Sequence, residues 1–162
     1  MKKGLQMKDG NSLVALLGKS EQDGQVKEVL ANFGINTPLP RPKKGEIKIY
    51  VEPANKGIDF IFRYAEVLFP GSSDYAEGEL IFDTIFFYPQ AKGKKKEDQI
   101  ALPFGLSVEF DRGHAYQKFG KPDWSSPRGN ADKWLMKNIS LHLEFDKDLK
   151  SIRLITISVH AG

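Results

Sequence analysis

The sequence predicts an α+β fold with a largely antiparallel sheet. Helical spacing of apolar residues opens the chain and returns near residue 111, whereas alternating apolar and polar residues, the pattern of strands, fill most of the remainder. Short turns join successive strands, as in antiparallel sheets. The chain has 162 residues, 40% of them hydrophobic, which is long enough to bury one ordinary core. We therefore expect residues 1–162 to form a single domain.

Composition excludes several classes of protein. The chain contains no cysteine, which removes disulfide frameworks, thiolate nucleophiles and sulfur-based zinc sites and indicates a reducing compartment. Residues 13–17 form an apolar run too short for a secretion signal. No run approaches the ~20 apolar residues that a membrane-spanning helix needs. We therefore expect a cytoplasmic protein that makes no membrane contact.

The first half of the chain places helices before strands. Residues 12–17 are a short helical candidate, and residues 22–33 carry apolar side chains at i, i+3, i+4 and i+7 before Gly34 ends the pattern. Three prolines within residues 38–42 forbid helix and favour an extended connection. Strands are expected next, the first two forming a hairpin, at residues 46–51, 58–62, 65–69 and 79–88.

The strand expected at residues 79–88 has bulky apolar groups on both faces, which is typical of the centre of a sheet. Strict alternation would divide its side chains into two sets, one of Phe82, Thr84, Phe86 and Tyr88 and one of Ile81, Asp83, Ile85 and Phe87. A charged loop at residues 91–98 then separates the two halves of the chain. The strand is expected at the centre of the sheet or clasped between two layers.

The second half shows a similar order of elements. Residues 111–120 predict a third helix, and residues 122–130 a turn-rich loop. Three strands are expected after this loop, the last two joined by a turn at Asp146-Lys147-Asp148, at residues 133–136, 139–145 and 151–159. The chain therefore ends inside the sheet.

This common order suggests an internal duplication with halves at about residues 11–90 and 100–160. Three pairs of segments correspond in it: residues 16–20 with 118–122, 58–62 with 141–145, and 80–88 with 152–160. Helix-plus-meander patterns also arise independently, so both explanations stay open. Two such halves would lay their helices on one face of the sheet and leave the other face partly open, as a surface for gripping another protein.

Two short motifs carry a family resemblance. The first motif is Leu102-Pro103-Phe104-Gly105-Leu106-Ser107, and the second, which follows a predicted helix, is Phe119-Gly120-Lys121-Pro122-Asp123. Together they resemble the pattern of the outer-membrane assembly lipoprotein family, whose tandem version occurs in the β-lactamase inhibitor protein. Gly120 and Pro122 also have a simpler explanation, since such residues end helices. The lipidated cysteine of the lipoproteins is missing, so their membrane role does not carry over.

The whole layout is similar to small bacterial immunity proteins that protect against polymorphic toxins. The similarity lies in the opening Leu-Leu-Gly-Lys helix at residues 16–19 and in the closing strand at residues 150–158. It implies that the chain binds a cognate protein toxin and neutralises it by occluding the active site. A structural or assembly module of lipoprotein-like fold is the alternative that the same resemblance allows.

Enzyme chemistry has little support in the residues. His142 alternates with two leucines and is expected to face solvent, His114 is expected to pair with Asp111 on a helix surface, and His160 lies near the end of the chain. These positions do not suggest a nucleophile with its base and orienting acid. No histidine pair at i, i+4 and no calcium-loop pattern occurs. We therefore predict no catalytic residue, no metal and no cofactor.

Nucleic-acid binding is a less favoured hypothesis. Gly18-Lys19-Ser20 lacks the preceding glycine and strand of a phosphate-binding loop. The runs Lys43-Lys44 and Lys94-Lys95-Lys96 are flanked by acidic residues, and the formal net charge is only +3. Because affinity for phosphates grows with the number of neutralised charges, so small an excess supplies little. A sequence pI near 9.0 favours a protein partner that is acidic or neutral.

A few residues are candidates for contact with that partner. Trp124 lies in a loop near Arg128, and exposed tryptophan beside arginine is typical of interface anchors. The alternative is that Trp124 caps the core beneath the loop, whereas Trp134 is expected inside the core. The predicted contact set comprises Trp124, Arg128, Lys94, Lys95, Lys96 and Tyr75.

Overall fold

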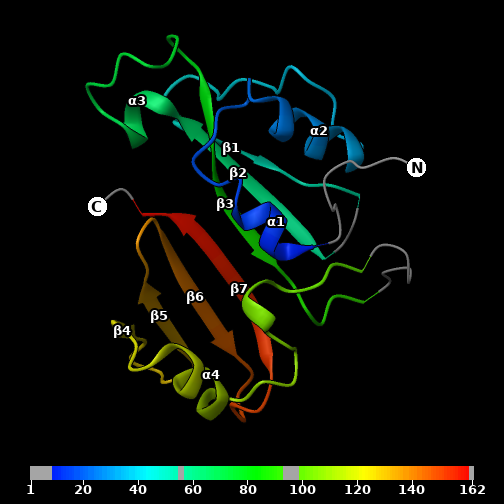
Figure 1. The fold of residues 1–162 in the computed structure, drawn as a ribbon, viewed down its shortest axis with the longest axis vertical. Helices are drawn as coiled ribbons and strands as arrows, with labels where there is room; N and C mark the ends of the chain where they lie inside the picture. Colours follow the sequence, from blue (N-terminus) through cyan, green and yellow to red (C-terminus); the bar gives the residue numbers. More distant parts are fainter. Residues whose placement is uncertain (1–8, 55–56, 93–98, 161–162) are drawn as a thin grey trace.

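The computed structural model describes residues 9–54, 57–92 and 99–160, and its strands form one seven-stranded antiparallel sheet (Figure 1). Their order across the sheet is β1-β2-β3-β7-β6-β5-β4. Each half of the chain thus contributes a meander, and the two meanders meet along their last strands, β3 and β7. The predicted α+β class with a largely antiparallel sheet is confirmed.

The elements have the following bounds. The strands are β1 (Lys48–Val51), β2 (Ile58–Tyr64), β3 (Leu80–Phe87), β4 (Trp124–Ser125), β5 (Ala131–Leu135), β6 (Ile139–Phe145) and β7 (Ile152–Val159). The helices are α1 (Gly10–Val14), α2 (Gly24–Asn32), α3 (Ala65–Leu68) and α4 (Arg112–Phe119), with a 3₁₀ turn at Pro103–Gly105. In the described ranges, none of these helices has the length and apolarity that crossing a membrane requires.

Aspartates begin three of the helices. The side chains of Asp9, Asp23 and Asp111 each accept a hydrogen bond, 2.8–2.9 Å long, from a backbone N–H in the first turn of α1, α2 and α4. These N–H groups have no partner inside the helix, so the caps satisfy them. The helices predicted at residues 22–33 and 111–120 are therefore present, whereas the first helix lies at residues 10–14 and overlaps the predicted range of 12–17 only in part.

One row of directly opposed side chains runs through the centre of the core. It crosses six strands and consists of Val51, Phe60, Ile85, Ile157, Leu141 and Trp134. All six are buried, and they pack in one cluster with Leu13 of α1, Val29 and Leu30 of α2 and Ala115 of α4. Figure 1 shows these three helices on the viewer's side of the sheet. The core thus lies between them and the sheet.

A bulge in β3 contradicts the strict alternation expected there. Phe82 and Thr84 pair with consecutive residues of β2, which leaves Asp83 as an extra residue. Phe82 and Ile85 therefore both join the core cluster, although alternation placed them on opposite faces. The Asp83 carboxylate accepts hydrogen bonds from the Arg63 guanidinium at 3.3 Å and the Thr84 hydroxyl at 2.8 Å.

Two local predictions were wrong. Residues 65–69 were expected as a short strand, but residues 65–68 form helix α3, since a run this short does not distinguish the two by periodicity. Residues 124–125, placed in a loop, form the edge strand β4, which is too short to show a strand pattern. Neither error changes the fold class.

The chain after α1 completes the sheet where β3 and β7 separate. The two strands pair only from Thr84 to Phe87, and Figure 1 shows them running apart beyond that point. There Gly18 N–H donates to the Phe82 carbonyl at 2.8 Å, and Phe82 N–H donates to the Lys19 carbonyl at 2.9 Å. Residues 18–21 thus pair with β3 over the part of β3 with which β7 does not pair.

The segments expected to correspond in a duplication occupy matching places in the sheet. β2 and β6 are the middle strands of their meanders, and β3 and β7 are the central pair. Matching places do not by themselves establish a duplication. The halves at residues 11–90 and 100–160, and a placement of all helices on one face, stay predictions.

The core row leads to a first testable prediction. Phe60 is fully buried and packs edge to face with Phe33 and Phe82, at centroid distances of 5.4 and 5.3 Å. We expect Phe60→Ala to lower the free energy of unfolding by about 3–5 kcal/mol, because a large cavity opens in a packed core. Urea denaturation measures this change. Tyr50→Ala, at a side chain 61% exposed, should change it by less than about 0.5 kcal/mol; equal losses in the two variants would contradict the assignment of the core.

Candidate functional site

The sheet has a second face, formed by side chains that alternate with those of the core. Two adjacent rows of directly opposed residues cross six strands each. One row is Tyr50, Ile61, Thr84, Ser158, Ser140 and Leu135, and the other is Asp59, Phe86, Thr156, His142, Lys133 and Trp124. We call these twelve residues the outer face.

The two ends of the outer face are the most open to solvent. Tyr50 is 61% exposed at one edge, and Leu135 and Trp124 are 48% and 45% exposed at the other. Phe86 and Thr156, between them, are half-buried. The face thus offers aromatic and aliphatic groups at its rims on a backbone that is hydrogen-bonded from strand to strand.

Trp124 forms the wall of a small pocket at one end of the outer face. It pairs with Lys133 across the β4–β5 ladder, and its indole stacks on the His142 ring with centroids 6.0 Å apart and planes 28° from parallel. Asp123 and Leu135 complete the lining of a hollow of about 370 Å³. Trp124 is therefore an exposed group on an edge strand and not a cap over the core.

His142 points away from the core, as expected, but Trp124 covers part of it. Burial is the main cause that lowers the pKa of His142, and the charge of Glu144 opposes this shift. The ring is therefore neutral at pH 7. A neutral imidazole stacks on the indole without burying a charge.

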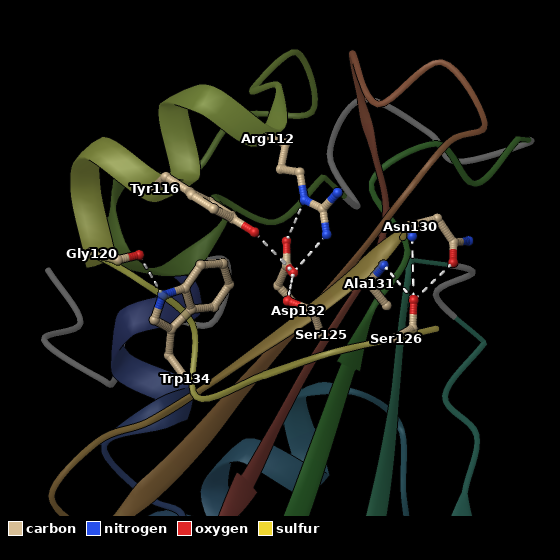
Figure 2. A network of polar contacts seen from close by, with 9 residues as sticks. All are labelled: Arg112, Tyr116, Gly120, Ser125, Ser126, Asn130, Ala131, Asp132 and Trp134. Atoms are coloured by element: carbon tan, nitrogen blue, oxygen red, sulfur yellow. Dashed lines mark hydrogen bonds and ion pairs between the residues drawn. The ribbon is translucent and has the colours of Figure 1, made fainter. Parts of the chain in front are cut away.

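A buried carboxylate holds the end of the sheet that carries Trp124 (Figure 2). The Asp132 side chain is fully buried, and the Arg112 guanidinium donates to both of its oxygens at 2.8 Å. Ser125 and Tyr116 hydroxyls also donate to it, at 2.6 and 3.2 Å. Burial alone would raise the pKa of Asp132, but the hydrogen bonds from Arg112 and Ser125 lower it below the usual value. Helix α4 and strands β4 and β5 thus share one ionised group.

The neighbouring turn is closed by a second set of hydrogen bonds. The Ser126 hydroxyl oxygen accepts from the backbone N–H groups of Asn130 and Ala131, both at 3.2 Å (Figure 2). The Trp134 indole N–H donates to the Gly120 carbonyl at 2.9 Å, and Trp134 lies in the core as predicted. Hydrogen bonds to residues of β5 therefore hold both the end of α4, which precedes β4, and the turn that follows β4.

The predicted contact residues do not form one group. Trp124 and Arg128 share the β4–β5 hairpin, with Arg128 exposed in its turn. Tyr75 is half-buried against Phe69, with ring centroids 5.6 Å apart. Figure 1 shows its loop at the opposite end of the molecule from β4. Lys94, Lys95 and Lys96 lie outside the described residues.

The sequence prediction missed most of the outer face. Tyr50, Phe86, Leu135 and His142 lie on it, yet only the pairing of distant strands brings them together. The available signal was the alternation within each strand, which marks the residues opposite the core. That signal does not tell which strands are neighbours.

The expected pair of His114 and Asp111 is present on the surface of α4. Asp111 Oδ1 lies 2.8 Å from both the ring Nδ1 and the backbone nitrogen of His114. The backbone hydrogen bond is the main cause that lowers the pKa of Asp111. The carboxylate therefore serves as the cap of the helix. Within residues 9–54, 57–92 and 99–160, no group of three or more metal-ligating side chains is present.

This is an α+β protein whose antiparallel sheet has one face packed in a core and a second face whose side chains are at least partly exposed, except for the buried Ile61 and Thr84. Comparisons with protein-family models, curated proteins and solved structures found no match to the chain.

The buried ion pair leads to a second testable prediction. We expect Arg112→Ala to lower the free energy of unfolding at pH 7 by about 3–5 kcal/mol, because Asp132 would be left charged and unpaired. The wild type loses stability as the pH falls below about 4, through the lowered pKa of Asp132. In the variant the pKa of Asp132 is raised, because the buried carboxyl has lost its cationic partner. Protonation of Asp132 at low pH therefore removes the unpaired buried charge that destabilises the variant.

The difference between the two proteins should therefore shrink between pH 7 and pH 4, as measured by urea denaturation at each pH. Gln117→Ala, at an exposed position of the same helix, is the matched control and should cost less than about 0.5 kcal/mol. A loss that stays constant with pH would show that Asp132 carries no unpaired charge in the variant.

Proposed function

We propose that this protein is a cytoplasmic, non-enzymatic immunity protein that binds a cognate bacterial toxin and neutralises it by covering its active site. The contact surface is the outer face of the sheet, with Trp124 as an anchor. The outer face is the observation that carries this proposal. The resemblance to immunity proteins supplies the toxin as the partner.

The size of the outer face suits a protein partner. Six strands at ~4.8 Å spacing span about 24 Å across the outer face. Its two rows hold twelve residues, so the outer face can form the centre of a standard interface, to which each partner contributes roughly 20–30 residues. Because the ladder already orders the backbone, binding would cost little conformational entropy.

The charges of the outer face favour a protein over a nucleic acid. Lys133 and Asp59 are its charged members, and they have opposite signs. A surface that tracks phosphates needs several cations in one stripe. Exposed tryptophan and tyrosine on a mixed polar surface are typical of protein interfaces. A structural or assembly module would use the same face, so experiment must separate these two functions.

Co-expression with the product of the adjacent gene tests the proposal. An immunity protein should relieve the toxicity of that product and co-elute with it in size-exclusion chromatography. Complex formation without any toxicity to relieve would favour the assembly module. Toxicity that persists in the presence of the folded chain would contradict the proposal.

Trp124 gives a third testable prediction. We expect Trp124→Ala to raise the Kd for the partner about 30-fold, or ~2 kcal/mol, since an exposed tryptophan at an interface acts as a hot spot. Isothermal titration calorimetry measures the change. Lys27→Ala, at an exposed position of α2 on the helix side of the sheet, should leave Kd within about twofold. Equal Kd values for wild type and Trp124→Ala would remove the outer face as the contact surface.

A further inference from the structure

A second concave site lies where β3 and β7 separate, away from the Trp124 pocket. It is a cleft of about 770 Å³ between the segment that follows α1, the β5–β6 turn and the end of β7. Its lining residues are Ala15, Leu17, Gly18, Lys19, Phe69, Met136, Lys137, Asn138, Val159 and His160. Both halves of the chain therefore build it.

The lining of this cleft combines apolar and basic side chains. An apolar wall is formed by Leu17 and Phe69 from the first half of the chain and by Met136 and Val159 from the second half. Lys19 and Lys137 are exposed beside this wall. None of the lining residues is acidic, and the ion pairs of the described residues include neither lysine. The cleft is thus a positively charged site with an apolar wall.

Backbone hydrogen bonds position both lysines. The Lys19 carbonyl accepts from Phe82 N–H at 2.9 Å, which attaches this residue to β3. On the other side, Met136 N–H donates to the Ile139 carbonyl, and His160 N–H donates to the Asn138 carbonyl, both at 2.8 Å. The β5–β6 turn that carries Lys137 is therefore tied to the end of β7. Both lysines that line the cleft therefore stand on hydrogen-bonded backbone.

We propose that this cleft binds an acidic segment of the protein partner, in which carboxylates flank apolar side chains. The carboxylates would pair with Lys19 and Lys137, and the apolar side chains would pack on the wall formed by Leu17, Met136 and Val159. A compact inorganic anion would leave this wall unfilled. A neutral apolar segment would gain nothing from the two cations.

This inference rests on the proposed function only in that a protein partner supplies the segment. The small positive net charge of the chain favours an acidic partner in general, but it does not locate the contact. The cleft locates it, because the cations gather beside apolar surface there.

Fluorescence anisotropy of a labelled peptide tests the cleft directly. The probe is the hexapeptide DELLDE, and the neutral hexapeptide NQLLNQ is its control. We expect the full-length protein to bind the acidic peptide at least about tenfold more tightly than the neutral one. The double variant Lys19→Glu/Lys137→Glu should raise the Kd for the acidic peptide at least about tenfold, because two negative charges then face the carboxylates of the peptide.

A second double variant separates this site from general attraction. Lys27→Glu/Lys147→Glu makes the same change in net charge at exposed positions outside the cleft, and it should keep Kd within about twofold. Any of three results would overturn the proposal. These are an equal loss of peptide affinity in both double variants, equal binding of both peptides, and no binding of either peptide. Displacement of the peptide by decanoate at much lower concentration would also overturn it, in favour of a fatty-anion site.

The outcomes for the two surfaces can be told apart. Trp124→Ala should leave peptide binding unchanged, since Trp124 does not line the cleft. Relief of toxicity without peptide binding would contradict the cleft alone. Peptide binding without relief of toxicity would contradict the proposed immunity function and leave the acidic-segment site supported.

Discussion

The antiparallel pairing of β3 with β7 is the interaction on which the rest of the structure depends. Four residue pairs, from Thr84–Ser158 to Phe87–Ile155, join two meanders that come from opposite halves of the chain. Because of this short ladder, the core rows of both meanders become one row and bury a common cluster. The same ladder makes the outer face continuous across six strands. Its limited length also opens the cleft, since residues 18–21 pair with β3 beyond the point where β7 departs.

Both central strands carry a charged residue at a bulge. Asp83 is the extra residue in β3, and Arg153 is the extra residue in β7, where Glu144 and Phe145 pair with Leu154 and Ile152. Each bulge lets apolar residues on both of its sides reach the core. Each also has a charged partner, Arg63 for Asp83 and Glu144 for Arg153. A bulge thus accommodates a charged residue in a central strand without removing an apolar residue from the core.

The proposed binding surfaces follow from these constraints. A sheet that is covered on one face must present the alternate side chains on the other, and here these include Tyr50, Phe86 and Trp124. The position of Trp124 depends on Asp132, which lies on the opposite side of β5 and ties β4 to α4 through Ser125 and Arg112. Helix α4 therefore contributes to the outer face without lying on it. Its role is to hold the edge strand that carries the anchor.

The sequence by itself determined the α+β class and the position of every strand except β4, because these follow from periodicity within short windows. It also identified Trp134 as a core residue and Trp124 as a candidate contact. Only the tertiary structure decided which residues share the outer face, that Trp124 stacks on His142, and that Lys19 and Lys137 face one cleft. These juxtapositions depend on register between strands that are distant in the chain. Alternation marks the face of a residue but not its neighbours, and a bulge such as Asp83 changes even the face.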